Sequence, residues 1–205
     1  TVFYGIQTFR QLIDRHIEGC FFPIVKIEDT PDFEHRAFFI DIARHFQPLR
    51  QIKKTVEAMS TYKMNRLQLG ISNDEGWRLA IQSIPELTEV GARRSYSRYT
   101  PEGVLRALYP AWGDDHHDYE GFLSREDFVS LLKHAKEHHV EVILEINLPG
   151  HANAFIQSVS KNDQWRLVDP EDTSEYRSAQ GYTKNVINVG MEDNYRMAKV
   201  ILEEI

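Results

Sequence analysis

Short apolar runs that each end in a group of polar residues recur along the chain. The runs cover residues 37–43, 65–71 and 140–146. The polar residues that follow them are Arg44-His45, Asn73-Asp74-Glu75, and Asn147 with His151. Continuous apolar runs rich in β-branched residues are typical of strands buried in a parallel sheet. We therefore expect three parallel strands whose carboxyl ends bring polar side chains to one shared site.

Apolar residues with helical spacing separate these runs. Pro48 opens a predicted helix whose apolar stripe is Leu49, Ile52, Val56 and Met59. Ser124 and Asp127 have the spacing of a capping box before a second helix, which leads into the strand at 140. Repeated strand–helix units with short connections predict an α/β fold with right-handed crossovers.

The two ends of the chain predict further elements. Residues 6–18 have helical apolar spacing closed by Gly19, and residues 21–27 read as a strand. Asp193 is the expected N-cap of a final helix. The helical pattern still continues at 199–205, and the residues that follow Thr1 already have the pattern of regular structure. We therefore expect the chain to be an internal piece of a longer protein.

Composition excludes several classes of protein. The net charge is −7 with no basic block, which argues against nucleic acid or an anionic membrane as the partner. No apolar run is long enough to span a bilayer. The single cysteine, Cys20, excludes an internal disulfide and a multi-cysteine metal site.

Four motifs resemble the family 20 glycoside hydrolases, the β-N-acetylhexosaminidases. They are Asp41-Ile42-Ala43-Arg44-His45-Phe46, Asn73-Asp74-Glu75-Gly76-Trp77-Arg78, residues 85–92, and Glu145-Ile146-Asn147-Leu148-Pro149-Gly150-His151. Residues 121–128 and 155–173 are similar to the bacterial chitobiase branch in particular. The motifs follow one another along essentially the whole chain, so together they are more specific than any one alone.

The resemblance implies an incomplete (β/α)8 TIM barrel. Its first three βα units would occupy residues 35–205, after the end of a small α+β domain and a linker in residues 1–34. It also implies an exo-acting enzyme that hydrolyses terminal N-acetylglucosamine from chitooligosaccharides, with no cofactor or metal. In this family the substrate's acetamido carbonyl replaces the carboxylate nucleophile, and the reaction is retaining. An Asp-Glu pair in a Gly-Gly-Asp-Glu motif supplies the general acid; because the motif does not occur here, we expect the chain alone to be inactive.

Two residues match family positions with assigned roles. Arg44 corresponds to the arginine that binds hydroxyls of the terminal sugar, and its planar guanidinium suits vicinal oxygens; an ion pair with Asp41 is the alternative. His151 corresponds to the histidine that orients the acid glutamate and adjusts its pKa; capping of the turn after Gly150 is its alternative.

The chain departs from the family at three positions. Asn73 and Asn147 stand where the family has carboxylates, and Gly70 stands where a histidine is usual. Asp74 is a partial substitute, although a shift of one residue is expected to point its side chain elsewhere. These departures motivate a second hypothesis, a catalytically impaired relative that binds amino sugars. Restoring both carboxylates would then raise kcat.

Other polar and aromatic residues have two interpretations each. Trp77 is a candidate for substrate contact or a packing anchor. Residues 91–121 form a long insertion that contains Tyr96, Tyr99, Tyr109 and Trp112. These aromatic side chains either form a platform for a second sugar or belong to a surface loop, and the sequence favours neither interpretation. We expect no metal site at Asp114-Asp115-His116-His117-Asp118, because adjacent histidines diverge. Histidines at 134, 138 and 139 fall at a helix C-terminus, whose dipole favours them.

The resemblance also sets expectations for partner and location. The expected partner is an N-acetylglucosamine-containing oligosaccharide, and the expected location is periplasmic, outer-membrane-associated or secreted, because polymer-derived substrates are met outside the cytoplasm. A third hypothesis is a separate structural module. We expect the chain alone not to unfold cooperatively, because three strands cannot close a barrel.

Overall fold

The computed structural model of the chain describes residues 2–16, 19–95, 105–106 and 120–205. Its central sheet has three parallel strands in the order β3 (Ala37–Asp41), β4 (Arg66–Asn73) and β8 (Glu141–Ile146). A short strand, β5 (Gly76–Trp77), folds back antiparallel onto the end of β4. The α/β fold expected from the alternating pattern is confirmed.

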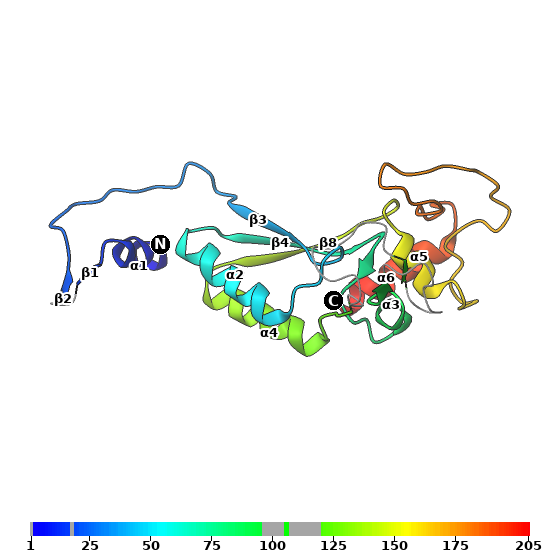
Figure 1. Cartoon of the computed structure of the whole chain (residues 1–205), viewed down its shortest axis with the longest axis horizontal. Helices are drawn as coiled ribbons and strands as arrows, with labels where there is room; N and C mark the ends of the chain where they lie inside the picture. The colour runs from blue at the N-terminus through cyan, green and yellow to red at the C-terminus, as the bar shows by residue number, and fades with distance from the viewer. Residues whose placement is uncertain (1, 17–18, 96–104, 107–119) are drawn as a thin grey trace.

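The remaining elements are α1 Val2–Gln11, β1 Asp14–His16, β2 Gly19–Phe21, α2 Leu49–Thr61, α3 Glu86–Glu89, β6 Arg94–Ser95, β7 Leu105–Arg106, α4 Arg125–Glu137, α5 Asn153–Val159 and α6 Glu192–Glu204. In Figure 1, α1, β1 and β2 lie beyond one end of this sheet, α3, α5 and α6 lie beyond the other end, and α2 and α4 lie along one face. No helix among the described residues has the length and apolar character needed to cross a membrane.

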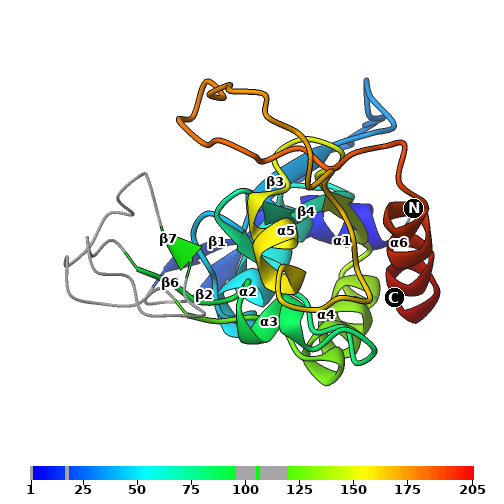
Figure 2. The same ribbon diagram turned by 90° about the vertical axis from the view of Figure 1, so that its right-hand side faces the viewer.

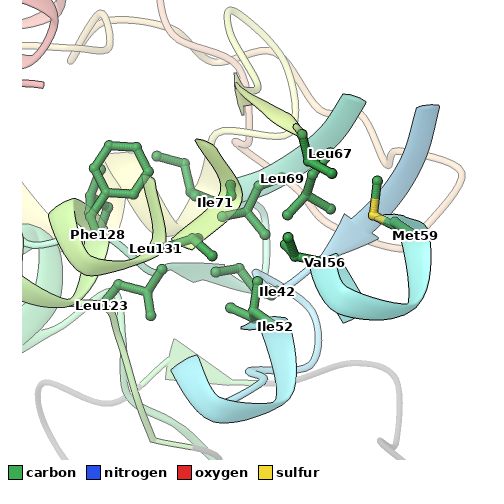
Figure 3. Close-up of a cluster of buried hydrophobic side chains, with 13 residues drawn as sticks. Ile42, Ile52, Val56, Met59, Leu67, Leu69, Ile71, Leu123, Phe128 and Leu131 are labelled. Atoms are coloured by element: carbon green, nitrogen blue, oxygen red, sulfur yellow. The ribbon is translucent and has the colours of Figure 1, made fainter. Parts of the chain in front are cut away.

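Helices α2 and α4 lie side by side along one face of the sheet (Figure 1). Figure 3 shows the core between these two helices and the sheet, to which α2 contributes the predicted stripe of Ile52, Val56 and Met59. The capping box is confirmed as well: Ser124 Oγ accepts from Asp127 N at 3.1 Å, and Asp127 Oδ2 accepts from Ser124 N at 3.1 Å. Burial of this apolar face is what holds both helices to the sheet.

Full burial, which was expected of all three strands, is found only in the central one. Residues at alternate positions of β4 are completely buried, whereas Phe38 and Phe39 on β3 are 46 % and 48 % exposed. Ile143 on β8 is 36 % exposed. Among the three parallel strands, β3 and β8 are the outer ones, and only β4 has a neighbouring strand on each side.

A second core lies beyond the carboxyl ends of the strands. It packs Trp77 and the residues around α3 against α5 and α6, with Ile84, Leu87, Phe155 and Met197 among its buried members. Figure 2 looks onto this end of the molecule, where the irregular segment between α5 and α6 arches over the strand ends. The segments that carry the polar residues after the strands are therefore packed against an apolar core.

Three sequence-based expectations are wrong. The helix predicted for 6–18 ends at Gln11, and Asp14–His16 pair instead with Gly19–Phe21 as a hairpin. Most of the strand predicted for 21–27 has no regular structure. Asp193 is not an N-cap, because α6 begins at Glu192 and the Asp193 carboxylate accepts from Arg166 N at 2.9 Å.

Candidate active site

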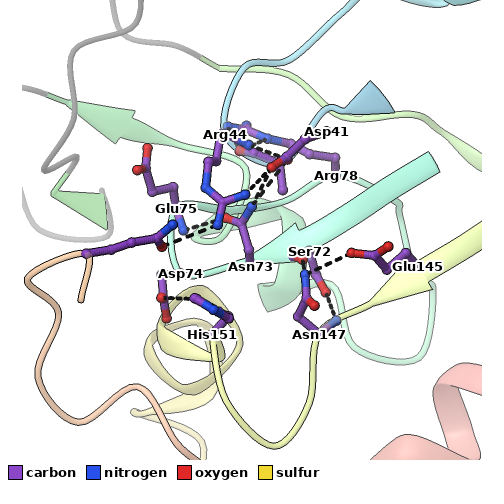
Figure 4. A network of polar contacts seen from close by, with 12 residues as sticks. Asp41, Arg44, Ser72, Asn73, Asp74, Glu75, Arg78, Glu145, Asn147 and His151 are labelled. Carbon is purple, nitrogen blue, oxygen red and sulfur yellow. Dashed lines mark hydrogen bonds and ion pairs between the residues drawn. The ribbon is translucent and has the colours of Figure 1, made fainter. Parts of the chain in front are cut away.

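Polar side chains from β3, β4 and β8 meet at the carboxyl ends of these strands (Figure 4). The parallel register sets Asp41 of β3 beside Gly70 of β4, and Gly70 beside Glu145 of β8. The turns that follow the three strands therefore begin at one edge of the sheet. The convergence expected from the sequence is found.

The first part of this network is centred on Asp41. Its carboxylate accepts from the backbone N of Arg44 at 3.0 Å and from the Arg44 guanidinium. Asn73 Nδ2 donates to both carboxylate oxygens at 3.2 Å. The ion pair offered as the alternative for Arg44 is thus present, and Arg44 Nη2 also donates to Gln180 Oε1 at 3.3 Å. The guanidinium is held at the rim with its side chain 37 % exposed.

The second part pairs Asp74 with His151. Asp74 is buried, and its Oδ2 accepts from His151 Nδ1 at 2.9 Å and from Asn185 Nδ2 at 3.0 Å, while Oδ1 accepts from Asn153 N at 3.1 Å. The Asp74 side chain thus points to a different partner from that of Asn73, as the one-residue shift predicts, and its carboxylate is the one that pairs with His151. A carboxylate at Nδ1 places the imidazole proton there, so Nε2 of the half-exposed ring can accept a hydrogen bond from another group.

Asn147 lies apart from this histidine and bonds to the end of β4 instead. Its Nδ2 donates to Ser72 O at 2.9 Å and to Glu145 Oε1 at 3.4 Å, and its backbone N donates to Ser72 Oγ at 3.2 Å. Glu145 also accepts from Gln68. Of the residues at the positions where the family has carboxylates, neither Asn73 nor Asn147 is the partner of His151, which pairs with the carboxylate of Asp74.

Trp77 does not line this site. It is fully buried in the second core, where its ring lies 5.7 Å from that of Phe155, and its Nε1 donates to Leu79 O at 2.5 Å. The prediction of a substrate contact is wrong, and the packing anchor is the correct alternative. The reason is that β5 folds back onto β4 and turns the indole into the interior.

Arg78 is a positioning residue that sequence reasoning missed. It is fully buried, and its guanidinium donates to the carbonyl of Ala43 at 3.0 and 3.2 Å and to those of Ala92 and Gly121 at 2.7 and 3.0 Å. These bonds fix the backbone immediately before Arg44. Its place directly after Gly76-Trp77, in a motif of the site, was the available signal.

A buried ion pair between Glu75 and Arg94 was missed as well. Both side chains are 1 % exposed. Burial raises the pKa of the Glu75 carboxyl, and the Arg94 and Arg44 guanidinium groups oppose that rise. Asn73 Oδ1 accepts from the Glu75 backbone N at 2.8 Å, which ties the pair to the strand-end network. Nothing in the local sequence pattern links two residues so far apart.

The remaining candidates divide into two groups. Tyr96, Tyr99, Tyr109, Trp112 and residues 114–118 lie outside the described residues, so their interpretations stay predictions. Within the described residues, one group of three possible metal ligands occurs, Glu57 with His134 and His138, and it is not part of this network.

Comparison with known proteins identifies the family. The catalytic domain of glycosyl hydrolase family 20 matches residues 33–205. Beta-hexosaminidase B of Pseudoalteromonas piscicida is 35 % identical over 99 % of the chain and 28 % of its own length. N,N'-diacetylchitobiase of Vibrio harveyi is 36 % identical over 99 % of the chain and 24 % of its own length. The chain thus spans about a quarter of the length of these relatives.

A solved structure agrees with this assignment. The exo β-N-acetylglucosaminidase of Vibrio harveyi, in complex with N-acetylglucosamine, superposes with a TM-score of 0.83 at 31 % identity. The superposition covers 98 % of this chain and 30 % of that one. With the matching catalytic domain and these relatives, the chain belongs to glycosyl hydrolase family 20.

Proposed function

We propose that this chain is part of an exo-β-N-acetylhexosaminidase of chitobiase type. The substrate would be a chitooligosaccharide, from which the enzyme removes terminal N-acetylglucosamine. The observation that carries the proposal is the pairing of Asp74 with His151 beside the Asp41–Arg44 pair, at the carboxyl ends of three parallel strands. In barrel enzymes this edge is where substrates bind. We propose accordingly that the three strands begin an incomplete (β/α)8 barrel.

Within this proposal each pair has its own task. Arg44 donates to hydroxyl oxygens of the non-reducing sugar, and Asp41 and Gln180 hold its guanidinium in place. His151, oriented by Asp74 through Nδ1, bonds through Nε2 to the general acid. That acid is a carboxyl group outside these 205 residues. The substrate's acetamido oxygen attacks the anomeric carbon while the acid protonates the leaving oxygen.

The test is hydrolysis by the full-length protein. A chromogenic β-N-acetylglucosaminide should be cleaved with retention of the anomeric configuration, which nuclear magnetic resonance of the first product detects. Inversion, or the absence of turnover together with retained binding of N-acetylglucosamine, would contradict the proposal. The second outcome would favour the impaired, sugar-binding relative. Fractionation of the producing cells tests the further proposal that the enzyme acts outside the cytoplasm.

The two asparagines do not support that impaired relative. Asn73 Nδ2 donates to both oxygens of Asp41, and Asn147 Nδ2 donates to Ser72 O and Glu145. A carboxylate at either position would face existing acceptors and could donate to none of them. These amides therefore complete the network as hydrogen-bond donors.

Restoring a carboxylate should accordingly lower activity. For Asn73→Asp and Asn147→Asp, each made separately, we expect kcat/KM to fall about tenfold, because losing a donor and gaining a facing charge costs on the order of 1–3 kcal/mol. Steady-state kinetics on the chromogenic substrate measures this. Asn188→Asp is the control, since Asn188 Oδ1 accepts from Gly190 N at 2.9 Å and a carboxylate oxygen preserves that bond. A rise in kcat in either variant would restore the hypothesis of lost charge.

A further inference from the structure

Two histidines and a glutamate gather between α2 and α4, away from the candidate active site. Glu57 lies on α2, and His134 and His138 lie in the last turn and at the C-cap of α4. The chain enters β8 at Glu141, only three residues after His138. The cluster therefore lies near the amino ends of the strands, whereas the site described above occupies their carboxyl ends.

The three side chains have the spacing of metal ligands. His134 and His138 are four residues apart, so both project from one face of α4, and their ring centroids are 4.3 Å apart. The His134 Nε2 to Glu57 Oε1 distance is 3.4 Å. One ligand atom from each of the three residues lies within 4.8 Å of the other two. Zinc–nitrogen and zinc–oxygen bonds are about 2.0–2.2 Å long, so an ion between these atoms would draw the three side chains closer together.

The hydrogen bonds of the two histidines leave a ring nitrogen of each available to bind a metal ion. His138 Nδ1 lies 2.8 Å from the carbonyl oxygen of His134, which only accepts, so Nδ1 carries the proton and Nε2 keeps its lone pair. A metal-binding histidine is commonly oriented by such a bond. His134 Nε2 is buried and makes no hydrogen bond within the described part of the chain. This nitrogen points towards Glu57, whose side chain is 54 % exposed and can receive an ion from solvent.

Charge at this position favours a cation. The carbonyl groups at the C-terminus of α4 carry partial negative charge, and the Glu57 carboxylate adds a full one. The Lys53 ammonium, one helical turn before Glu57, opposes a bound cation, and it is held by a hydrogen bond to Ser130 Oγ at 2.7 Å. Two imidazoles and one carboxylate form a ligand set that suits Zn²⁺ and related divalent transition metals.

We propose that Glu57, His134 and His138 bind a divalent transition metal ion of the zinc class, with water completing the coordination. The ion cross-links α2 to α4 and stabilises the sheet that both helices cover. The ion takes no part in hydrolysis, so this proposal does not depend on the proposed enzymatic function and is tested separately from it. Sequence alone does not reveal the site, because Glu57 belongs to another helix far away along the chain.

Isothermal titration of the full-length protein with ZnCl2 tests the proposal. The protein should carry no histidine tag and be stripped with a chelator first. We expect binding that is weakened at least about tenfold by His134→Ala, His138→Ala and Glu57→Gln, since loss of even an outer partner of a metal ligand costs that much. His139→Asn is the matched control. His139 has a φ of 56°, which asparagine tolerates, and it is not in the cluster.

Thermal unfolding and Co²⁺ spectra provide the readouts that separate binding from misfolding. Zn²⁺ should raise the Tm of the wild-type protein and of His139→Asn, and should raise the Tm of the three cluster variants by clearly less at the same Zn²⁺ concentration. Co²⁺ should give the visible absorption of a four-coordinate ion that disappears in these variants. Equal Zn²⁺ affinity in the wild-type and cluster variants would overturn the proposal, as would a wild-type Tm that Zn²⁺ does not change.

Discussion

Asp74→Asn should lower kcat on a terminal N-acetylglucosaminide by about a hundredfold or more in the full-length protein. The Asp74 carboxylate accepts from His151 Nδ1 and holds the proton on that nitrogen. An amide can present its NH2 group to Nδ1, which moves the proton to Nε2 and leaves that nitrogen unable to accept. Replacing a carboxylate that orients a histidine costs about 10–100-fold at metal sites and about 10⁴-fold in serine proteases.

The kinetic parameters distinguish this role from sugar binding. Asp74→Asn should change kcat with little effect on KM, because His151 is proposed to act on the acid and not on the substrate. Arg44→Ala should chiefly raise KM, because it removes a donor to the sugar. Asp163→Asn, an exposed carboxylate outside the network, should leave both parameters unchanged. A near-normal kcat in Asp74→Asn would show that the Asp74–His151 pair is not needed for catalysis.

Arg94→Met should strongly destabilise the folded protein. Arg94 and Glu75 are both 1 % exposed, so the variant leaves a buried carboxylate without its guanidinium. Breaking a buried ion pair from one side costs about 3–5 kcal/mol. We expect a loss of that order in the free energy of unfolding, measured by denaturant titration of the full-length protein. Arg93→Met is the control, because the exposed Arg93–Glu120 pair contributes less than about 1 kcal/mol.

The destabilisation of Arg94→Met should grow with pH. Burial raises the pKa of Glu75, and removing Arg94 takes away a group that opposes this rise. A raised pKa means that the folded protein binds the proton more tightly than the unfolded chain. The stability from the neutral carboxyl is then present below the unfolded pKa and lost as pH rises through the folded pKa. The variant should lose less stability near about pH 5 than near about pH 8.

A double variant checks the cause. Glu75→Gln combined with Arg94→Met removes both charges, so it should recover a large part of the lost stability. If the double variant is as unstable as Arg94→Met, the loss arises from packing and hydrogen bonds of the arginine, and the unpaired charge is not its cause.

Local patterns in the sequence were sufficient for the elements around the central sheet. The stripe of Ile52, Val56 and Met59 and the capping box at Ser124 depend on residues within one or two helical turns. The three apolar runs became strands for a similar reason, since each run is continuous and ends in turn-forming polar residues. The N-terminal helix was predicted too long, because pairing between 14–16 and 19–21 overrides its helical spacing.

The sequence by itself determined which residues stand at the strand ends, because chain order and apolar periodicity place Arg44, Asp74 and His151 just after β3, β4 and β8. Only the tertiary structure decided which of their side chains meet. Asn73 at the end of β4 points to Asp41, Asp74 in the turn that follows points to His151, and Trp77 of β5 is buried. The physical reason is that these contacts depend on side-chain direction across neighbouring strands, which spacing along one strand does not record.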